Sequence, residues 1–304
     1  MSALFLLVAC SGPPPQGDTS STPSGDAATV PLGGACPLAE RVGGFEVSVN
    51  DLYSTIGGAV ADGVLPISVL TPVASAGECT LLRRENPSCV PTCEPGQTCD
   101  FDGTCIDYPD NLDLGHVRIE GLEDPVDMTA DPVGNTYFDT TLSHPVFMPD
   151  AYIELTTESG LTLHGVGVEP LVPTSTGWII GVDPLVVSWA PPTGLGRSTV
   201  QVRLTIDQHG LTPLSLVCEA VDDGELTVDP TLVTTLREAG VTGYPNGRLS
   251  RRSLDRATLG SGCADLAVSF ELLPEVSVEG HTPCDSHDDC PRGQLCNFVL
   301  ETCE

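Results

Sequence analysis

Two short segments of this sequence each place four cysteines within 20 residues, and the two segments are copies of one pattern. Residues 89–105 read CVPTCEPGQTCDFDGTC and residues 284–303 read CDSHDDCPRGQLCNFVLETC, and both contain Cys-x-x-Gly-Gln-x-Cys. Segments this short cannot bury a hydrophobic core, so disulfide bridges must take its place. The repeat therefore predicts two small disulfide-stapled modules, at residues 87–106 and 281–304.

The four cysteines of each module allow three connectivities, and we predict first-to-third and second-to-fourth pairing in both. The cysteines concerned are Cys89, Cys93, Cys99 and Cys105, then Cys284, Cys290, Cys296 and Cys303. The modules resemble the short cysteine-rich repeats of the Dickkopf N-terminal and EGF-like kinds. The resemblance covers about 40 of the 304 residues. It implies an extracellular setting and names no ligand.

The N-terminus carries a short apolar run that ends in small residues and a cysteine, a pattern typical of export and processing signals. Its last residues, Leu7-Val8-Ala9-Cys10, resemble the lipobox of bacterial lipoproteins. The resemblance implies cleavage before Cys10 and a diacylglycerol on its thiol. Residues 1–9 are then a signal peptide, short and without a basic residue, which indicates a truncated start. The alternative is a buried N-terminal strand with an ordinary cysteine.

Residues 10–34 are rich in Pro, Ser, Thr and Gly, which predicts a flexible linker behind the lipid anchor. Ser11, directly after the cysteine, resembles the outer-membrane default of Gram-negative lipoproteins. No later run of about 18 apolar residues occurs, so the sequence predicts no transmembrane helix. We therefore expect an outer-membrane lipoprotein, periplasmic or surface-exposed, that carries palmitate and touches the membrane through its lipid alone.

The cysteine count supports the same compartment. Of 13 cysteines, one is assigned to the lipid, and the remaining 12 are an even number that suits up to six disulfides in an oxidising setting. Cys36 and Cys79 flank a run of short alternating strands at residues 35–86, and we expect them to form one bridge. Cys218 and Cys263 lie on two other expected elements and are predicted to staple the main body.

The charge balance excludes several classes of partner. The formal net charge is −30, and all 12 basic residues are arginine. Nucleic-acid affinity depends on neutralising phosphates, so this chain is not expected to bind nucleic acid. Without lysine it cannot form a P-loop. Aromatic residues are 5% of the chain, so the core must consist mainly of Val, Leu and Ile.

The body, residues 107–280, has many short alternating segments separated by turn signals, which predicts a β-sandwich. In residues 199–206 the apolar positions alternate with Gln201, Arg203 and Thr205, so the two sets face opposite sides. A turn is expected at residues 244–247. One helix is predicted, with Asp229 as its cap, Pro230 in its first turn and Gly240 at its end. The fold class is all-β: a sandwich, a smaller N-terminal β unit, two modules and one short helix.

One strand of the body resembles a known signature. Residues 185–192 read LVVSWAPP, similar to the B strand of fibronectin type III domains, in which a buried Trp anchors the core. The resemblance implies that Trp189 is buried and that residues 200–204 form strand C. It covers about 25 residues, and the later Cys218 and helix depart from that family.

Catalytic motifs are missing from the sequence. There is no Gly-x-Ser-x-Gly elbow, no His-Glu-x-x-His helix and no Cys-x-x-Cys pair, and the six histidines are scattered. We therefore expect a protein that is not an enzyme and needs no cofactor. The alternative is a hydrolase whose site is assembled only in space.

Two groups of charged residues are candidate binding sites. Calcium prefers hard oxygen ligands, and clustered carboxylates occur at Asp100, Asp102, Asp222, Asp223, Asp285, Asp288 and Asp289. Solvated turn carboxylates are the alternative there. A basic cluster contains Arg248, Arg251, Arg252 and Arg256. It either binds a sulfated or carboxylated glycan or pairs with acidic groups of its own fold.

Together these features predict a non-enzymatic cell-envelope lipoprotein. Its expected role is structural or adhesive, or the recognition of an envelope or surface protein. A calcium- or glycan-binding surface module is the first alternative.

Overall fold

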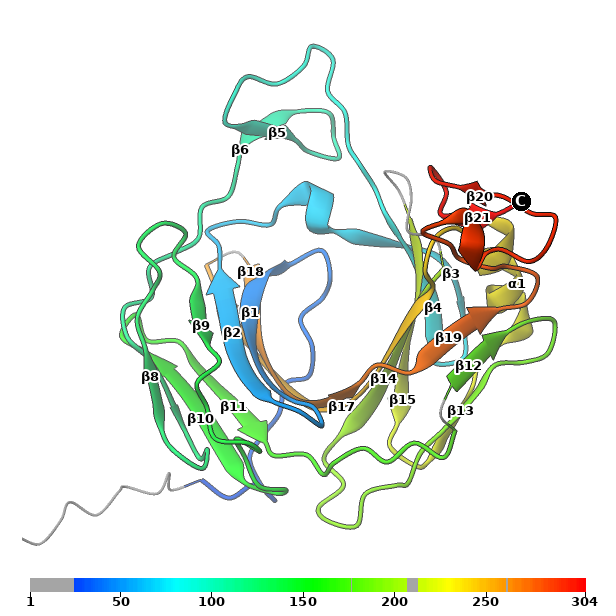
Figure 1. Ribbon diagram of the computed structural model, residues 1–304. Coiled ribbons are helices and arrows are strands. Elements are labelled where there is room, and N and C mark those ends of the chain that lie inside the picture. Colours follow the sequence, from blue (N-terminus) through cyan, green and yellow to red (C-terminus); the bar gives the residue numbers. More distant parts are fainter. Residues whose placement is uncertain (1–24, 176, 207–212, 261) are drawn as a thin grey trace, which may run out of the picture.

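The computed structural model describes residues 25–175, 177–206, 213–260 and 262–304 (Figure 1). Within these ranges the chain forms strands throughout, with one α-helix and two short 3-10 helices. The predicted all-β class is confirmed. Cys10, the proposed signal peptide and His209 lie outside the described residues.

The centre of the fold is a nine-stranded sheet. In spatial order its strands are β3 (Leu70–Ala76), β4 (Cys79–Arg84), β15 (Leu214–Val221), β14 (Thr199–Thr205), β17 (Asn246–Leu259), β18 (Gly262–Leu272), β1 (Arg41–Val49), β2 (Ser54–Val60) and β9 (Tyr137–Asp139). Strand β1 runs parallel to β18, and the other neighbours are antiparallel. Figure 1 shows that the sheet curls strongly, so that it has a concave and a convex face.

Smaller elements cover the convex face (Figure 1). A four-stranded sheet contains β11 (Thr162–Val166), β10 (Tyr152–Thr157), β7 (Val117–Glu120) and β8 (Val126–Met128), and β11 contacts β17 and β18. Two-stranded sheets pair β12 (Gly177–Ile180) with β19 (Glu275–Val278), and β13 (Val186–Ser188) with β16 (Glu225–Thr227). Helix α1 (Pro230–Glu238) contacts β15, β3 and β4.

Side-chain alternation explains why the core lies on the convex side. On β14, Val200, Val202 and Leu204 are fully buried, whereas the alternate residue Arg203 is exposed on the concave face. Successive residues of a strand point to opposite faces, so the convex side of each strand joins one large hydrophobic cluster with the covering layer. The concave side of these strands carries many polar residues and borders an open hollow whose lining is part polar and part apolar.

The two modules have the predicted disulfides. In the first, β5 (Gln97–Cys99) pairs with β6 (Cys105–Asp107), and the bridges are Cys89–Cys99 and Cys93–Cys105. In the second, β20 (Cys296–Asn297) pairs with β21 (Thr302–Cys303), preceded by the 3-10 helix η2 (His287–Asp289). Its bridges are Cys284–Cys296 and Cys290–Cys303.

The other two expected bridges are wrong. Cys36 pairs with Cys263, not with Cys79, and Cys79 pairs with Cys218. The reason is the sheet order: β1 lies beside β18, and β4 lies beside β15, where Cys79 and Cys218 are register partners. The four N-terminal strands are therefore part of the main sheet and do not form a separate unit.

The linker prediction is also wrong for its last residues. Ala27 and Val30 are buried against Val166, and the Arg197 guanidinium donates to the carbonyl oxygens of Ala27 and Val30 at 2.7 and 2.5 Å. The Gly33 N–H donates to Asp255 at 2.7 Å. Residues 26–34 thus dock on the body, because carbonyl groups and small apolar side chains find partners there.

The predicted helix is confirmed. Asp229 caps it by accepting a hydrogen bond from the Thr231 N–H at 2.8 Å, and its buried stripe is Leu232, Val233 and Leu236. Gly240 follows its end at a positive φ of 127°. The turn expected at residues 244–247 is wrong for its last two residues, because strand β17 already begins at Asn246.

Candidate functional site

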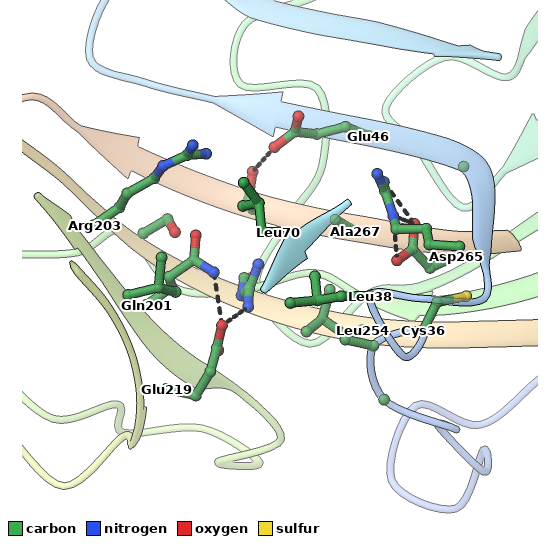
Figure 2. Close-up of a pocket in the computed structure, with 18 of the residues that line it drawn as sticks. Cys36, Leu38, Glu46, Leu70, Gln201, Arg203, Glu219, Leu254, Asp265 and Ala267 are labelled. Atoms are coloured by element: carbon green, nitrogen blue, oxygen red, sulfur yellow. Dashed lines mark hydrogen bonds and ion pairs between the residues drawn. The ribbon is translucent and has the colours of Figure 1, made fainter. Parts of the chain in front are cut away.

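The concave face of the nine-stranded sheet holds a hollow of about 990 Å³, which we call the trough (Figure 2). Strands β14, β15, β17, β18 and β1 form its floor. The segment between β2 and β4, which includes η1 (Pro66–Ser68), borders it on another side. Protein sites for small molecules commonly have volumes of about 300–1,000 Å³, so the trough is large enough for such a ligand.

The floor of the trough is polar. Four arginines and five acidic residues line it: Arg41, Arg203, Arg248, Arg252, Glu46, Glu78, Glu219, Asp265 and Glu271. Ser250 and Ser269 add hydroxyl groups between them. Leu70, Leu82 and Leu254 are among the apolar residues of the lining. The site therefore offers charges and hydrogen-bonding groups together with patches of aliphatic surface.

Three of these four arginines are paired with carboxylates. Arg41 Nη2 lies 2.9 Å from Asp265 Oδ1, and Arg248 Nη1 lies 3.0 Å from Glu271 Oε1. Arg252 forms an ion pair with Glu219, which also accepts from Gln201 Nε2 at 2.6 Å. Two of these pairs link neighbouring strands, and the Arg252–Glu219 pair reaches across β14 from β17 to β15. Together they neutralise most of the charge on the floor.

Arg203 differs from the other three. The structure gives its guanidinium no hydrogen bond and no ion pair among the described residues, although it lines the trough. Partial desolvation by the surrounding groups lowers the pKa of Arg203, and repulsion from Arg248 and Arg84 lowers the pKa further. Arg248 is its register partner on β17. This end of the trough therefore holds an uncompensated positive charge.

The opposite charge dominates elsewhere in the trough. Burial raises the pKa of Glu271, and the nearby Glu46 raises it further, against the attraction of Arg248 and Arg252. Glu46 has no ion pair among the described residues; Ser269 donates to it at 3.4 Å. Figure 2 shows Arg203 at the end of the site away from Asp265 and Cys36. Arg203 therefore lies away from the Arg41–Asp265 pair.

The basic cluster predicted from the sequence is split between the two faces of β17. Arg248 and Arg252 lie in the trough, both already paired. Arg256 donates to the Ala35 carbonyl oxygen at 2.9 Å. Arg251 points to the convex side and is 1% exposed, so it cannot meet a ligand. All four arginines of this cluster therefore bond to groups of the protein itself, as the internal-pairing alternative predicted. Among the arginines that line the trough, Arg203 is the one without such a partner in the described residues.

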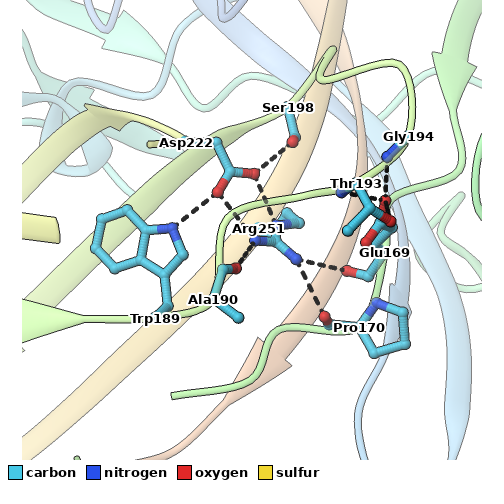
Figure 3. A network of polar contacts seen from close by, with 9 residues as sticks. All are labelled: Glu169, Pro170, Trp189, Ala190, Thr193, Gly194, Ser198, Asp222 and Arg251. Carbon is cyan, nitrogen blue, oxygen red and sulfur yellow. Dashed lines mark hydrogen bonds and ion pairs between the residues drawn. The ribbon is translucent and has the colours of Figure 1, made fainter. Parts of the chain in front are cut away.

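Arg251 stands at the centre of a buried polar network (Figure 3). Its Nε donates to Asp222 Oδ2 at 2.7 Å, and its Nη2 donates to Asp222 Oδ1 at 3.0 Å and to the Ala190 carbonyl oxygen at 2.6 Å. Its Nη1 donates to the Pro170 carbonyl oxygen at 3.0 Å. Trp189 Nε1 donates to the same Asp222 carboxylate at 2.8 Å.

This network is structural. It ties the loops around residues 170 and 190 to the main sheet, and the Trp189 side chain is 2% exposed, as the sequence predicted. Asp222, one of the calcium candidates, is already bonded to Arg251, Trp189 and Ser198. Its carboxylate is therefore not available to a cation.

The remaining calcium candidates do not come together. Asp102 accepts hydrogen bonds from Thr104, Asp100 accepts from the Phe101 N–H, and Asp289 accepts from Ser286. Asp223, Asp285 and Asp288 join no cluster of three potential ligand atoms. Within the described ranges, such clusters consist of module cysteines, whose sulfurs are bonded to one another.

Histidine–hydroxyl contacts occur outside the trough. Ser54 Oγ lies 3.0 Å from His144 Nδ1. Tyr152 donates from its hydroxyl to Glu154 at 2.7 Å and lies 2.9 Å from His164 Nδ1. Burial, and then the Glu154 carboxylate, raise the pKa of Tyr152 to about 12. The described residues that line the trough include no histidine, so no Ser–His–acid arrangement faces it.

Comparisons with known proteins add little. No family model matches the sequence, and no curated protein matches it. A crystal structure of the FN1–FN3 domains of chicken CNTN1 is similar over 71% of this chain and 68% of that chain, with 9% sequence identity and a TM-score of 0.18. At that score the likeness carries no argument about fold or function.

Within the described residues, no helix has the length and apolar character needed to cross a membrane.

Sequence reasoning placed Arg203 on the polar side of its strand but did not single it out as a site residue. Alternation alone cannot distinguish a solvated outer face from the inside of a curled sheet. The sequence signal that exists is weak: an arginine amid β-branched residues, with no acidic residue between Thr199 and Ile206.

Proposed function

We propose that this protein is a non-enzymatic, lipid-anchored recognition protein of a Gram-negative cell envelope, and that the trough is its recognition surface. The observation that carries the recognition role is the trough itself, with its polar floor and one unpaired arginine. A rigid sheet suits binding because side chains on regular strands are held in place before the ligand arrives.

The disulfides support the extracytoplasmic part of the proposal. All 12 cysteines from Cys36 to Cys303 form six bridges with one another. Structural bridges of this density are found in oxidising compartments. Because these 12 cysteines pair with one another, none of them needs Cys10 as a partner, which supports our proposal that the Cys10 thiol carries the lipid.

Two measurements test the anchoring and the compartment. Cells that express the full chain are fed labelled palmitate, and the label is expected in the wild-type protein and not in Cys10→Ala. Label that persists in Cys10→Ala would contradict lipidation at this site. Alkylation without reductant, followed by mass spectrometry, is expected to modify none of the 12 later cysteines. Twelve modified cysteines would contradict maturation in an oxidising compartment.

A second candidate function, docking of an envelope protein by the modules, has one specific observation in its favour. Phe101 and Phe298 occupy equivalent positions of the repeat and are 45% and 60% exposed. Exposed aromatic side chains are frequent anchors in protein interfaces. Crosslinking on intact cells should lose a partner band in Phe101→Ala plus Phe298→Ala if this role is correct, and should keep it in Arg203→Gln.

A further inference from the structure

The trough contains one cation that the fold does not use. Arg41, Arg248 and Arg252 each bind a carboxylate of the protein, whereas Arg203 has no partner among the described residues. The neighbouring charges that lower the pKa of Arg203 are the guanidinium groups of Arg248 and Arg84, with no carboxylate opposing them. Like charges held together are unfavourable in a partly desolvated site, so an anion bound there would relieve the repulsion.

We propose that Arg203 is the anchor for an organic carboxylate that binds in the trough. This inference rests on the proposed recognition role and names the chemical class of the ligand. A guanidinium presents a planar fork of donors that matches a carboxylate with two parallel hydrogen bonds. Because none of the donors of Arg203 is occupied by the described protein groups, the whole fork is available to the ligand.

The charge balance of the trough favours a singly charged ligand. Four arginines face five carboxylates on its lining, and three of each form ion pairs, which leaves Arg203 against Glu46 and Glu78. A monoanion at Arg203 compensates the single free guanidinium. A dianion such as phosphate would add a second negative charge to a lining that is already net acidic.

The rest of the lining defines the body of the ligand. Beyond Arg203, the floor offers Gln201, Ser250 and the acidic Glu46, which accept hydrogen bonds from hydroxyl or amino groups. Leu70, Leu82 and Val217 offer aliphatic contact near the same strands. The carboxylate is therefore the shared chemistry, carried either by a polyhydroxylated acid or by an aliphatic acid. Few aromatic side chains line the trough, so it offers little surface for the ring stacking that is typical of neutral sugar binding.

The test uses calorimetric titration of the purified, oxidised full chain at pH 7. Probes come in matched pairs: galacturonate with galactose, and octanoate with octanamide, plus inorganic phosphate. At least one carboxylate is expected to bind, with its neutral counterpart weaker by about tenfold or more, as expected for loss of a charge-assisted bidentate pair. Binding of galacturonate indicates a sugar acid, and binding of octanoate indicates an aliphatic acid.

Three variants assign the effect to the residue. Arg203→Gln should weaken carboxylate binding by about tenfold or more, and Arg203→Lys, which keeps the charge and loses the fork, should fall between Gln and wild type. Arg118→Gln is the matched control, because Arg118 is a half-exposed arginine of the outer sheet, paired with Glu120; binding should stay within about twofold. A thermal melt of each variant verifies that it is folded.

Several results would overturn the proposal. They are no binding of either carboxylate by the wild type, equal binding by a folded Arg203→Gln, or tighter binding of phosphate than of both carboxylates. None of these would affect the palmitate and alkylation results, so failure of the ligand class is distinguishable from failure of the envelope assignment. If the palmitate and alkylation tests fail while carboxylate binding is observed, the envelope assignment is wrong and the ligand class stands.

Discussion

The two faces of the nine-stranded sheet use arginine in opposite ways, and the adjacent residues Arg251 and Arg252 show the contrast. Arg251 points to the convex side, is 1% exposed and donates to Asp222 and to backbone carbonyl groups. Arg252 points into the trough and pairs with Glu219, while its Nε is buried without a hydrogen-bond partner. One residue step along a strand therefore separates a fully bonded cation from an incompletely bonded one.

This difference in hydrogen bonding indicates different roles for the two faces of the sheet. On the convex face an unpaired charge would be buried away from water at high cost, so the network around Arg251 is complete and locks the covering loops to the sheet. On the concave face, solvent in the trough lowers that cost, so Arg203 can remain unpaired. The comparison predicts large effects on stability from convex-face changes and small effects from concave-face changes.

Replacement of Arg251 should give the largest effect. Arg251→Met leaves Asp222 as an uncompensated buried charge and should lower the free energy of unfolding by about 3–5 kcal/mol. Urea denaturation followed by fluorescence of the two buried tryptophans, Trp178 and Trp189, measures it. Adding Asp222→Asn removes the unpaired buried carboxylate and keeps an oxygen that accepts from Trp189, so the double variant should recover part of the lost stability. A single variant as stable as wild type would contradict the structural role.

Removal of the bridge between β4 and β15 should come next. Replacing Cys79 and Cys218 with Ala frees a loop of 139 residues in the unfolded chain, which should cost about 2–4 kcal/mol. The matched control replaces Cys89 and Cys99 with Ala. That pair closes only 10 residues within a module, so the melt of the main sheet should hardly change. Equal destabilisation by both variants would show that module and sheet unfold together.

Arg203→Gln is expected to leave stability almost unchanged. Because the guanidinium has no partner among the described residues and is repelled by Arg248 and Arg84, its loss should alter the free energy of unfolding by no more than about 0.5 kcal/mol. The same urea titration measures it beside Arg251→Met. A loss comparable to that of Arg251→Met would mean that Arg203 holds the fold together.

The smallest effect concerns the pH dependence of the trough. The pKa of Glu271 is raised by burial and by Glu46, so the folded state binds this proton more tightly than the unfolded state does. Its contribution to stability is therefore full below the unfolded pKa and is lost as pH rises through the raised folded pKa. Relative to Glu271→Gln, the wild type should gain stability between pH 7 and pH 4. A difference that does not change over this range would contradict the shift.

Local patterns made part of this structure predictable. The alternation of residues 199–206 predicted β14, the cap at Asp229 predicted α1, and close cysteine spacing predicted the module bridges, because each depends on neighbours in sequence. Strand β17 was missed because Arg251 and Asp255 occupy buried positions on it. Its pattern therefore lacks the apolar alternation typical of a half-buried strand.

Long-range features were not predictable. Pairing of Cys36 with Cys263 follows from β1 lying beside β18, and nothing near either cysteine encodes that neighbour. The free guanidinium of Arg203 has the same origin. It depends on Glu271 from β18 pairing with Arg248 and on Glu219 pairing with Arg252, while neither of the other two carboxylates, Glu46 and Glu78, forms an ion pair with Arg203.

The pairing of β1 with β18 also sets an order of events during synthesis. Cys36 leaves the ribosome 227 residues before Cys263. The edge of β1 that pairs with β18 therefore has no partner until almost the whole chain has been synthesised. Assembly that depends on such distant partners is slow, and a waiting strand edge invites pairing with the wrong chain. The central sheet can therefore close only after β18, its last long strand, has been synthesised.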